Sequence, residues 1–112
     1  WKKNLAEVAK CPNVVVKLGG IGQPRTGYDW SSRDKPIGSE ELAGLMAPFI
    51  NYAIEQFGPE RGMIESNFPP DKVGHSYNIL YNAFKRLTKD YSTSERDAMF
   101  RGTAERVYRV EY

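Results

Sequence analysis

Cysteine and histidine are scarce in this sequence of 112 residues, which holds one of each, Cys11 and His75. A single cysteine has no partner for an internal disulfide, and one cysteine with one histidine cannot form the usual four-ligand zinc site. Disulfides are typical of oxidising compartments, so their exclusion here favours a reducing one. We therefore expect a cytoplasmic protein.

Long apolar runs and blocks of like charge are also missing. No stretch approaches the roughly 18 consecutive apolar residues of a membrane span, and no basic-then-apolar leader precedes a cleavage site. The formal net charge of +2 is spread along the chain. Neither a membrane nor a nucleic acid is therefore expected as a partner.

What is present is the composition of an ordinary globular protein, with 40% hydrophobic and 27% charged residues. A chain of 112 residues has room for one small domain, which excludes a two-domain organisation. Because the sequence opens on Trp1, directly inside an expected helix, we also expect the natural protein to continue upstream of it.

The spacing of apolar residues predicts helices that alternate with strands. The expected order is helix 2–10, strand 14–18, loop 21–38, helix 39–57, strand 62–66, helix 77–90 and helix 93–109. Such alternation is typical of an α/β protein whose crossovers return to a parallel sheet. The valine run at the start of the first strand suits a strand that is covered on both faces.

Local signals add detail to the helices. Ser39 is expected to cap the helix that follows it, and Pro48 to kink or break that helix. The capping-box spacing from Ser92 to Glu95 predicts the start of the last helix. The long loop before Ser39 is rich in Gly, Pro, Ser and Asp, and loops of that length are usually functional or disordered.

The strand ends are the expected location of a functional site. In parallel sheets the loops at the carboxyl ends of the strands carry the working residues. Two such ends exist here, residues 17–22 and residues 65–71, and both face one mouth if the strands are parallel.

The second strand end offers three polar groups of different chemistry. Ser66, Asn67 and Asp71 supply a hydroxyl, an amide and a carboxylate, with two prolines stiffening the turn between them. Either these groups serve a site, or Ser66 and Asn67 satisfy the turn backbone while Asp71 is solvated. His75 is likewise either a general base or metal ligand, or a surface residue near a helix start.

The first strand end leaves its alternatives open too. Lys17 is either a charged group at the pocket mouth or the outward end of a strand. Trp30 and Tyr28 either line a substrate pocket or cover the end of the sheet. The run Gly19–Gly22 lacks the third glycine and the immediate helix of a phosphate-binding loop. Cys11 lies at the opposite end of the first strand, which argues against a nucleophilic role.

Several short motifs resemble those of the amidohydrolase-2 family. They are Gly58-Pro59-Glu60-Arg61, Ser66-Asn67-Phe68-Pro69 and Thr103-Ala104 followed by Val107-Tyr108-Arg109, in that order. The family comprises predicted metal-dependent hydrolases of the TIM-barrel fold. The resemblance implies that residues 1–112 are the C-terminal part of such a domain, a partial (β/α)8 barrel with the seventh and eighth strands and a terminal helix.

The resemblance also implies a chemistry. It points to a small-molecule substrate with a lactone or amide carbonyl that an activated water attacks, with zinc or manganese as the divalent metal of the full-length protein. The family's His-x-His pair would lie upstream of Trp1, so no metal ligand is assigned within this chain. Asn67 stands where many members have an Asp, and Asp71 is a hypothetical substitute for it.

These considerations give a set of candidate site residues. The candidate catalytic residues are Asn67 and Asp71, and the candidate substrate-binding residues are Lys17, Ser66, Trp30 and His75.

A second function class is a catalytically inactive partial barrel. Two strands cannot close a barrel of eight, and unpaired strand edges recruit other chains. That alternative predicts a homo-oligomer formed by self-association.

Overall fold

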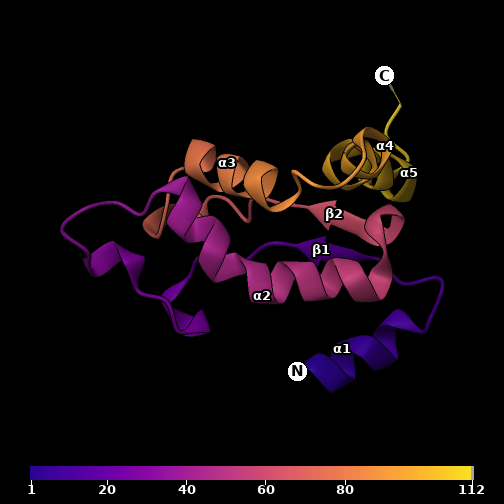
Figure 1. The fold of residues 1–112 in the computed structure, drawn as a ribbon, viewed down its shortest axis with the longest axis horizontal. Helices are drawn as coiled ribbons and strands as arrows, with labels where there is room; N and C mark the ends of the chain where they lie inside the picture. The colour runs from indigo at the N-terminus through magenta and orange to yellow at the C-terminus, as the bar shows by residue number, and fades with distance from the viewer. Residues whose placement is uncertain (112) are drawn as a thin grey trace.

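Two short parallel strands form the sheet at the centre of the molecule (Figure 1). The structure, a computed structural model, describes residues 1–111. β1(Val16–Leu18) pairs with β2(Gly62–Ile64), and Leu18 lies opposite Ile64. The prediction of parallel strands with mixed helix and strand content is confirmed, although each strand is shorter than expected.

Helices surround this sheet on the side where its apolar residues point. α1(Lys2–Ala9) precedes β1, and α2(Ser39–Phe57) crosses over from β1 to β2 and contacts both strands. α3(Tyr77–Leu87) follows β2 and packs along α2 (Figure 1). Within residues 1–111, no helix is both long and apolar enough to cross a membrane.

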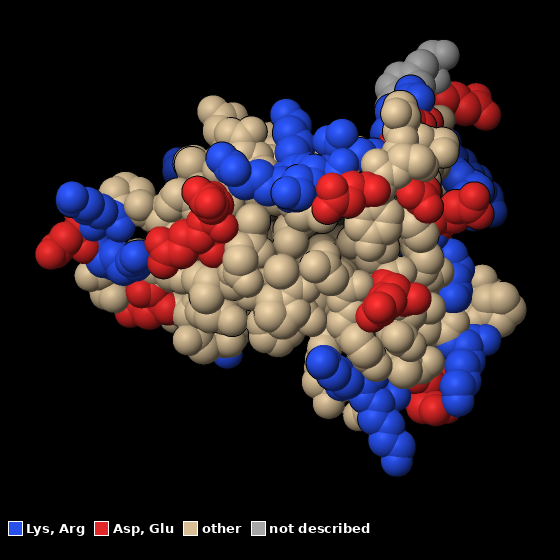
Figure 2. All heavy atoms as spheres, viewed as in Figure 1, with Lys and Arg blue, Asp and Glu red and all other residues tan. Residues whose placement is uncertain are grey.

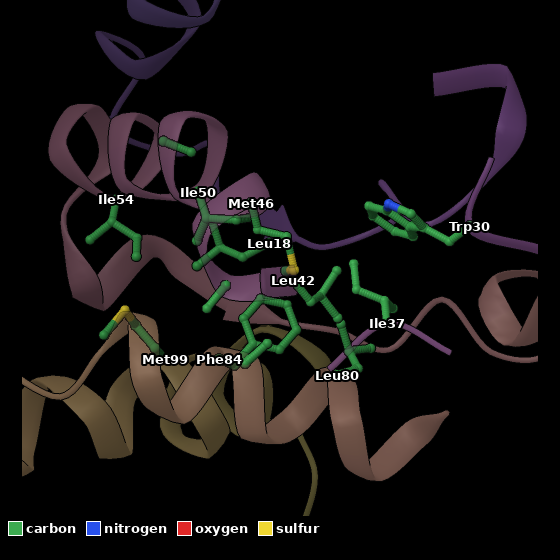
Figure 3. Packing of buried hydrophobic residues seen from close by; sticks show 13 residues of the cluster. Leu18, Trp30, Ile37, Leu42, Met46, Ile50, Ile54, Leu80, Phe84 and Met99 are labelled. Atoms are coloured by element: carbon green, nitrogen blue, oxygen red, sulfur yellow. The ribbon is translucent and has the colours of Figure 1, made fainter. Parts of the chain in front are cut away.

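The hydrophobic core fills the space between β1, α2 and α3. Met46 and Ile50 of α2 approach Leu18 of β1 on one side and Phe84 of α3 on the other (Figure 3). Fully burying a side chain of this size contributes about 1.5–3 kcal/mol. The predicted apolar face of α2 is confirmed except at Phe49, which remains 37% exposed.

The prediction of a first strand covered on both faces was wrong. Val14 and Val15 precede the strand and are only partly buried, while Lys17 is exposed. The alternation of side chains explains this, because Leu18 faces α2 and Lys17 points the other way. One face of the two-stranded sheet therefore carries a charged residue at its centre.

The details expected for α2 need correction. The helix continues through Pro48 without a break, and its N-cap is Gly38 instead of Ser39. Continuous packing of the apolar stripe on both sides of Pro48 holds the two halves together despite the lost hydrogen bond. Ser39 instead accepts a hydrogen bond from Nε of Arg86 on α3, at 3.0 Å.

The last helical segment contains a π turn that the sequence pattern did not predict. It consists of α4(Thr93–Asp97), the π-helical η5(Ala98–Gly102) and α5(Thr103–Tyr108). The predicted capping box at its start is confirmed. The wider turn lets Met99 face the sheet while Thr103 donates to the carbonyl of Glu60 at 3.0 Å.

Short 3-10 turns complete the chain. They are η1(Pro24–Thr26), η2(Trp30–Ser32), η3(Pro59–Arg61) and η4(Pro70–Val73). The first two lie in the predicted long loop, and the last connects the end of β2 to α3. The face seen in Figure 2 carries charge of both signs, with Lys and Arg gathered around α3 and a largely uncharged surface over α2.

Arg61 clamps the amino-terminal ends of the strands. Its guanidinium donates to the carbonyls of Ala9 at 2.8 Å, Cys11 at 2.9 Å, Val14 at 3.2 Å and Phe57 at 3.0 Å. These carbonyls come from the end of α1, from the segment between α1 and β1, and from the end of α2. One planar cation thus fixes three segments that meet where β2 begins.

We predict that Arg61→Met lowers the free energy of unfolding by about 2 kcal/mol, because hydrogen bonds from a charged donor are among the stronger ones. Urea unfolding followed by circular dichroism measures the change. Arg25→Met is the matched control, since Arg25 is exposed and makes no side-chain hydrogen bond within residues 1–111. Equal stability of the two variants would contradict the clamp.

Candidate active site

The carboxyl ends of β1 and β2 bring two segments of the chain together. The backbone N–H of Glu65 donates to the carbonyl of Leu18 at 3.2 Å, which extends the ladder by one bond beyond β2. Residues 19–23 then run beside residues 65–71. The site residues are therefore positioned by the sheet itself.

Glycines allow this close approach. A Cβ on Gly19 would lie 2.5 Å from the carbonyl oxygen of Glu65, and a Cβ on Gly22 would collide with the His75 ring. Gly20 has a φ of 77° and lies beside the side chains of Glu65 and Asn67. This glycine run therefore serves backbone packing between the two strand ends.

Asp71 ties the two segments together from a buried position. Its carboxylate accepts hydrogen bonds from Asn67 Nδ2 at 2.7 Å, Gln23 Nε2 at 3.0 Å and the Gly22 backbone at 3.3 Å. The residue is 1% exposed. The interpretation of Asp71 as a solvated turn residue was wrong, because η4 folds its side chain back under the first strand end.

The turn between Asn67 and Asp71 is shaped by its polar residues. Asn67 adopts a φ of 51°, a left-handed conformation that asparagine tolerates better than most residues. Ser66 accepts a hydrogen bond from the Phe68 N–H at 3.2 Å. Ser66 therefore accepts from the turn backbone, and the Asn67 amide donates to Asp71.

His75 lies inside the structure between two aromatic rings. It is 6% exposed, with its ring centroid 5.9 Å from that of Trp30 and 6.0 Å from that of Phe68. The interpretation of His75 as a surface residue was wrong, because the loop that carries Trp30 folds over it. Within residues 1–111, its Nδ1 is buried without a hydrogen-bond partner.

Burial lowers the pKa of His75 from its usual 6.5, since desolvation penalises the charged imidazolium. Neighbouring backbone groups and the charge of Asp71 raise the pKa but are weaker influences. The neutral ring is therefore the favoured form in the folded protein.

Trp30 is buried in the loop that covers His75, and its role as a substrate-binding residue stays a prediction. It is 7% exposed and stacks on Tyr28 with the ring centroids 5.0 Å apart, so it covers His75. It also borders a hollow of about 380 Å³ together with His75 and Lys72.

Lys17 pairs with a residue that was not among the predicted site residues. Its ammonium lies 2.8 Å from Oε2 of Glu65, and this hydrogen bond and the negative charge raise the pKa of Lys17. The pair lies on the sheet face that points away from α2. The alternation of side chains along a strand could have predicted this pair. Lys17 lies opposite Met63, and Glu65, two residues after Met63, points to the same face.

Gln23 and the Gly22 amide are also parts of the site that sequence reasoning missed. Their contribution depends on the path of the loop after β1, which no short motif encodes. Among residues 1–111, no group of three or more His, Cys, Asp or Glu side chains is arranged to hold a metal ion.

Comparison with known proteins shows the family. Residues 1–110 match the amidohydrolase family, and this chain belongs to it. It is 37% identical over 110 residues to the uncharacterized protein y4mH of Sinorhizobium fredii, covering 98% of this chain and 33% of that protein. It is also 31% identical over 109 residues to an L-fucono-1,5-lactonase of Burkholderia multivorans, covering 96% of this chain and 34% of the lactonase.

Solved structures agree with this membership. A zinc-bound amidohydrolase from Burkholderia multivorans superposes with a TM-score of 0.82 at 29% identity, over 99% of this chain and 37% of that one. A structure of a Burkholderia multivorans amidohydrolase with bound HEPES gives the same values. The chain spans about a third of the length of the curated relatives it matches.

The three hydrogen bonds that Asp71 accepts, called here the Asp71 network, predict that Asp71→Asn lowers the stability of the protein. The new amide places an N–H₂ group against donors that need an acceptor, which costs about 1–3 kcal/mol. Hydrogen exchange at the Gly22 amide should accelerate together with a loss of stability. Asp34→Asn is the control, because Asp34 is exposed with no side-chain partner within residues 1–111. Unchanged Gly22 exchange in Asp71→Asn would refute the network.

His75 predicts a pH dependence of stability. The pKa of His75 is lower in the folded protein than its value of 6.5 in the unfolded chain. Its contribution to the free energy of unfolding is therefore complete above pH 6.5 and is lost as the pH falls toward the pKa of the folded state. Urea midpoints measured from about pH 7.5 to about pH 5.5 should fall more in the wild type than in His75→Leu. The same pH dependence in both proteins would rule out burial of a neutral histidine.

Proposed function

We propose that this chain forms the end of a TIM barrel in a hydrolase, with β1 and β2 as its seventh and eighth strands. Two observations support the proposal. The strands are parallel and joined by the crossover helix α2, as in a (β/α)8 barrel. The sheet face opposite α2 carries Lys17 and Glu65, and polar side chains at carboxyl strand ends are typical of a barrel active site.

The proposed reaction is hydrolysis of a lactone or amide carbonyl in a small molecule by an activated water. The single observation that carries it is the polar edge formed by both strand ends in a chain of the amidohydrolase family. The likeness to an L-fucono-1,5-lactonase favours a lactone of a sugar acid. The protonated Lys17 ammonium would attract the carbonyl oxygen as negative charge develops on it.

The candidate residues divide between the reaction and its support. Asp71 accepts three hydrogen bonds from its own chain. We therefore propose that Asp71 and Asn67 hold the loop after β1 against the turn after β2. A catalytic role for either of them stays a prediction, as do the substrate contacts of Ser66. Trp30 and His75 would form the wall beside the hollow that they border.

A resident metal does not fit the described residues by themselves. Asn67 and Asp71 are engaged with each other, and residues 1–111 hold no cluster of three suitable ligands. The alternative of an inactive, self-associating chain has no support among the matched relatives, and homo-oligomer formation through the open strand edges stays a prediction.

A chimera tests the proposed function. The matching 109 residues of the Burkholderia multivorans L-fucono-1,5-lactonase are replaced by this chain, and hydrolysis of L-fucono-1,5-lactone is followed by acid release. We expect the chimera to hydrolyse the lactone faster than buffer, because this chain supplies an equivalent wall of the site. A matched amide substrate separates lactone from amide specificity.

The control chimera carries Lys89→Ala, a change at an exposed position remote from the strand ends. It should behave as the parent chimera does. A chimera that folds, as judged by circular dichroism, but shows no rate above buffer on either substrate would contradict the proposed function.

A further inference from the structure

We propose that Glu65 is the carboxylate that accepts and returns the proton of the attacking water, with Lys17 as the residue that positions it. This inference rests on the proposed hydrolase function and adds a catalytic residue to it. It departs from the sequence prediction, in which Asn67 and Asp71 were the catalytic candidates.

The Asp71 carboxylate is not accessible to a water or a substrate. Asp71 is 1% exposed, and Asn67, Gln23 and Gly22 donate to its oxygens. A water or substrate could reach it only by displacing these donors. Such a displacement would release the loop after β1 from the end of β2.

Glu65 has the access that Asp71 lacks. Its side chain is 24% exposed, and Lys17 engages only its Oε2. Within residues 1–111, Oε1 has no hydrogen-bond partner, so it can accept a proton from a bound water. One oxygen of the carboxylate is thus held in place while the other remains free for chemistry.

The backbone fixes the position of this free oxygen. The hydrogen bond from the Glu65 N–H to the Leu18 carbonyl anchors the residue to β1. Gly19 packs against the Glu65 side chain, and a Cβ at Gly20 would lie 3.7 Å from both Oε1 of Glu65 and Nδ2 of Asn67. Gly19 therefore lets the Glu65 side chain lie directly against the end of β1, and Gly20 lies beside both the carboxylate and the Asn67 amide.

Lys17 holds the carboxylate and supplies a positive charge. It stands at the middle of β1, on the same face as Glu65, with 54% of its side chain exposed. Its pKa is raised by the hydrogen bond and charge of Glu65, so the ammonium stays protonated at neutral pH. This ion pair fixes one rotamer of Glu65. It also places the Lys17 ammonium where it would stabilise the negative charge that develops on the substrate carbonyl oxygen.

The proton transfer balances within the substrate and one water. The water oxygen bonds to the lactone carbonyl carbon while a water proton passes to Glu65 Oε1. The bond from that carbon to the ring oxygen then breaks, and Glu65 returns the proton to the departing oxygen. The product is a hydroxy acid, which ionises and releases a proton to solvent.

The test compares Glu65→Gln, Glu65→Asp and Lys17→Met with the control Glu40→Gln, whose residue is exposed on α2. Each change is made in the chimera described above, and its turnover of L-fucono-1,5-lactone gives kcat and KM over a range of pH. Binding of the corresponding 1,5-lactam, which resists hydrolysis, is followed by backbone amide NMR in every variant, and in the unchanged chain also by the carbon-13 signal of the Glu65 carboxyl group. Circular dichroism confirms that each variant folds.

We expect Glu65→Gln to lose about 100-fold or more in kcat with its KM and lactam affinity little changed. The acidic limb of the pH profile should disappear in Glu65→Gln and persist in Lys17→Met at a lower kcat. Glu65→Asp should keep part of the rate. A folded Glu65→Gln protein that turns over like Glu40→Gln would overturn the inference.

Failure of the proposed function gives a different pattern. If the folded chimera with the unchanged chain hydrolyses no lactone, that function fails, and lactam binding decides the inference about the site. A lactam-induced shift of the Glu65 carboxyl signal would still place the ligand at this carboxylate. The absence of any shift, in a protein shown to be folded, would overturn the assignment of Glu65 as well.

Discussion

The structure depends on one buried carboxylate. Asp71 draws the loop after β1 onto the turn after β2, because its oxygens accept from Gly22 and Gln23 on one segment and from Asn67 on the other. Buried charge is costly unless hydrogen bonds compensate it, and here the donors come from both segments. Without this carboxylate, two strands of three residues each would have little to align their ends.

This constraint determines which groups are left for chemistry. Since Asp71 is buried and accepts from Asn67, the accessible charged groups at the same edge are Lys17 and Glu65. The aromatic cover buries His75 and favours its neutral form, because burial lowers its pKa. The carboxyl ends of the strands thus hold two different parts. One is the buried hydrogen-bonded group around Asp71, and the other is the Lys17–Glu65 ion pair, which is open to solvent.

Sequence patterns predicted the elements well where apolar spacing dominates. The long stripe of α2 and the capping box at Ser92 were both legible, since each depends on residues close together in the chain. The π turn at η5 and the place of Ser39 inside α2, where it accepts from Arg86, were missed, because contacts with distant segments decide them. Local propensity carries no information about such contacts.

The site shows the same division. The sequence indicated the strand ends, and Asn67 and Asp71 do meet there. Burial of Asp71 and His75 could not be predicted, because it comes from Gly22 and Trp30, which lie about fifty residues earlier in the chain. Glu65 was overlooked although strand alternation places it beside Lys17.

The Lys17–Glu65 ion pair is thus the proposed place of substrate binding and reaction, while Asp71 holds the two strand ends together. A crystal structure of the protein with a sugar 1,5-lactam tests this most directly. The account predicts the lactam against Glu65 and Gly20, with Asp71 still accepting from Gly22, Gln23 and Asn67. A lactam bound to the Asp71 carboxylate, with Gly22 and Gln23 displaced from it, would contradict the account.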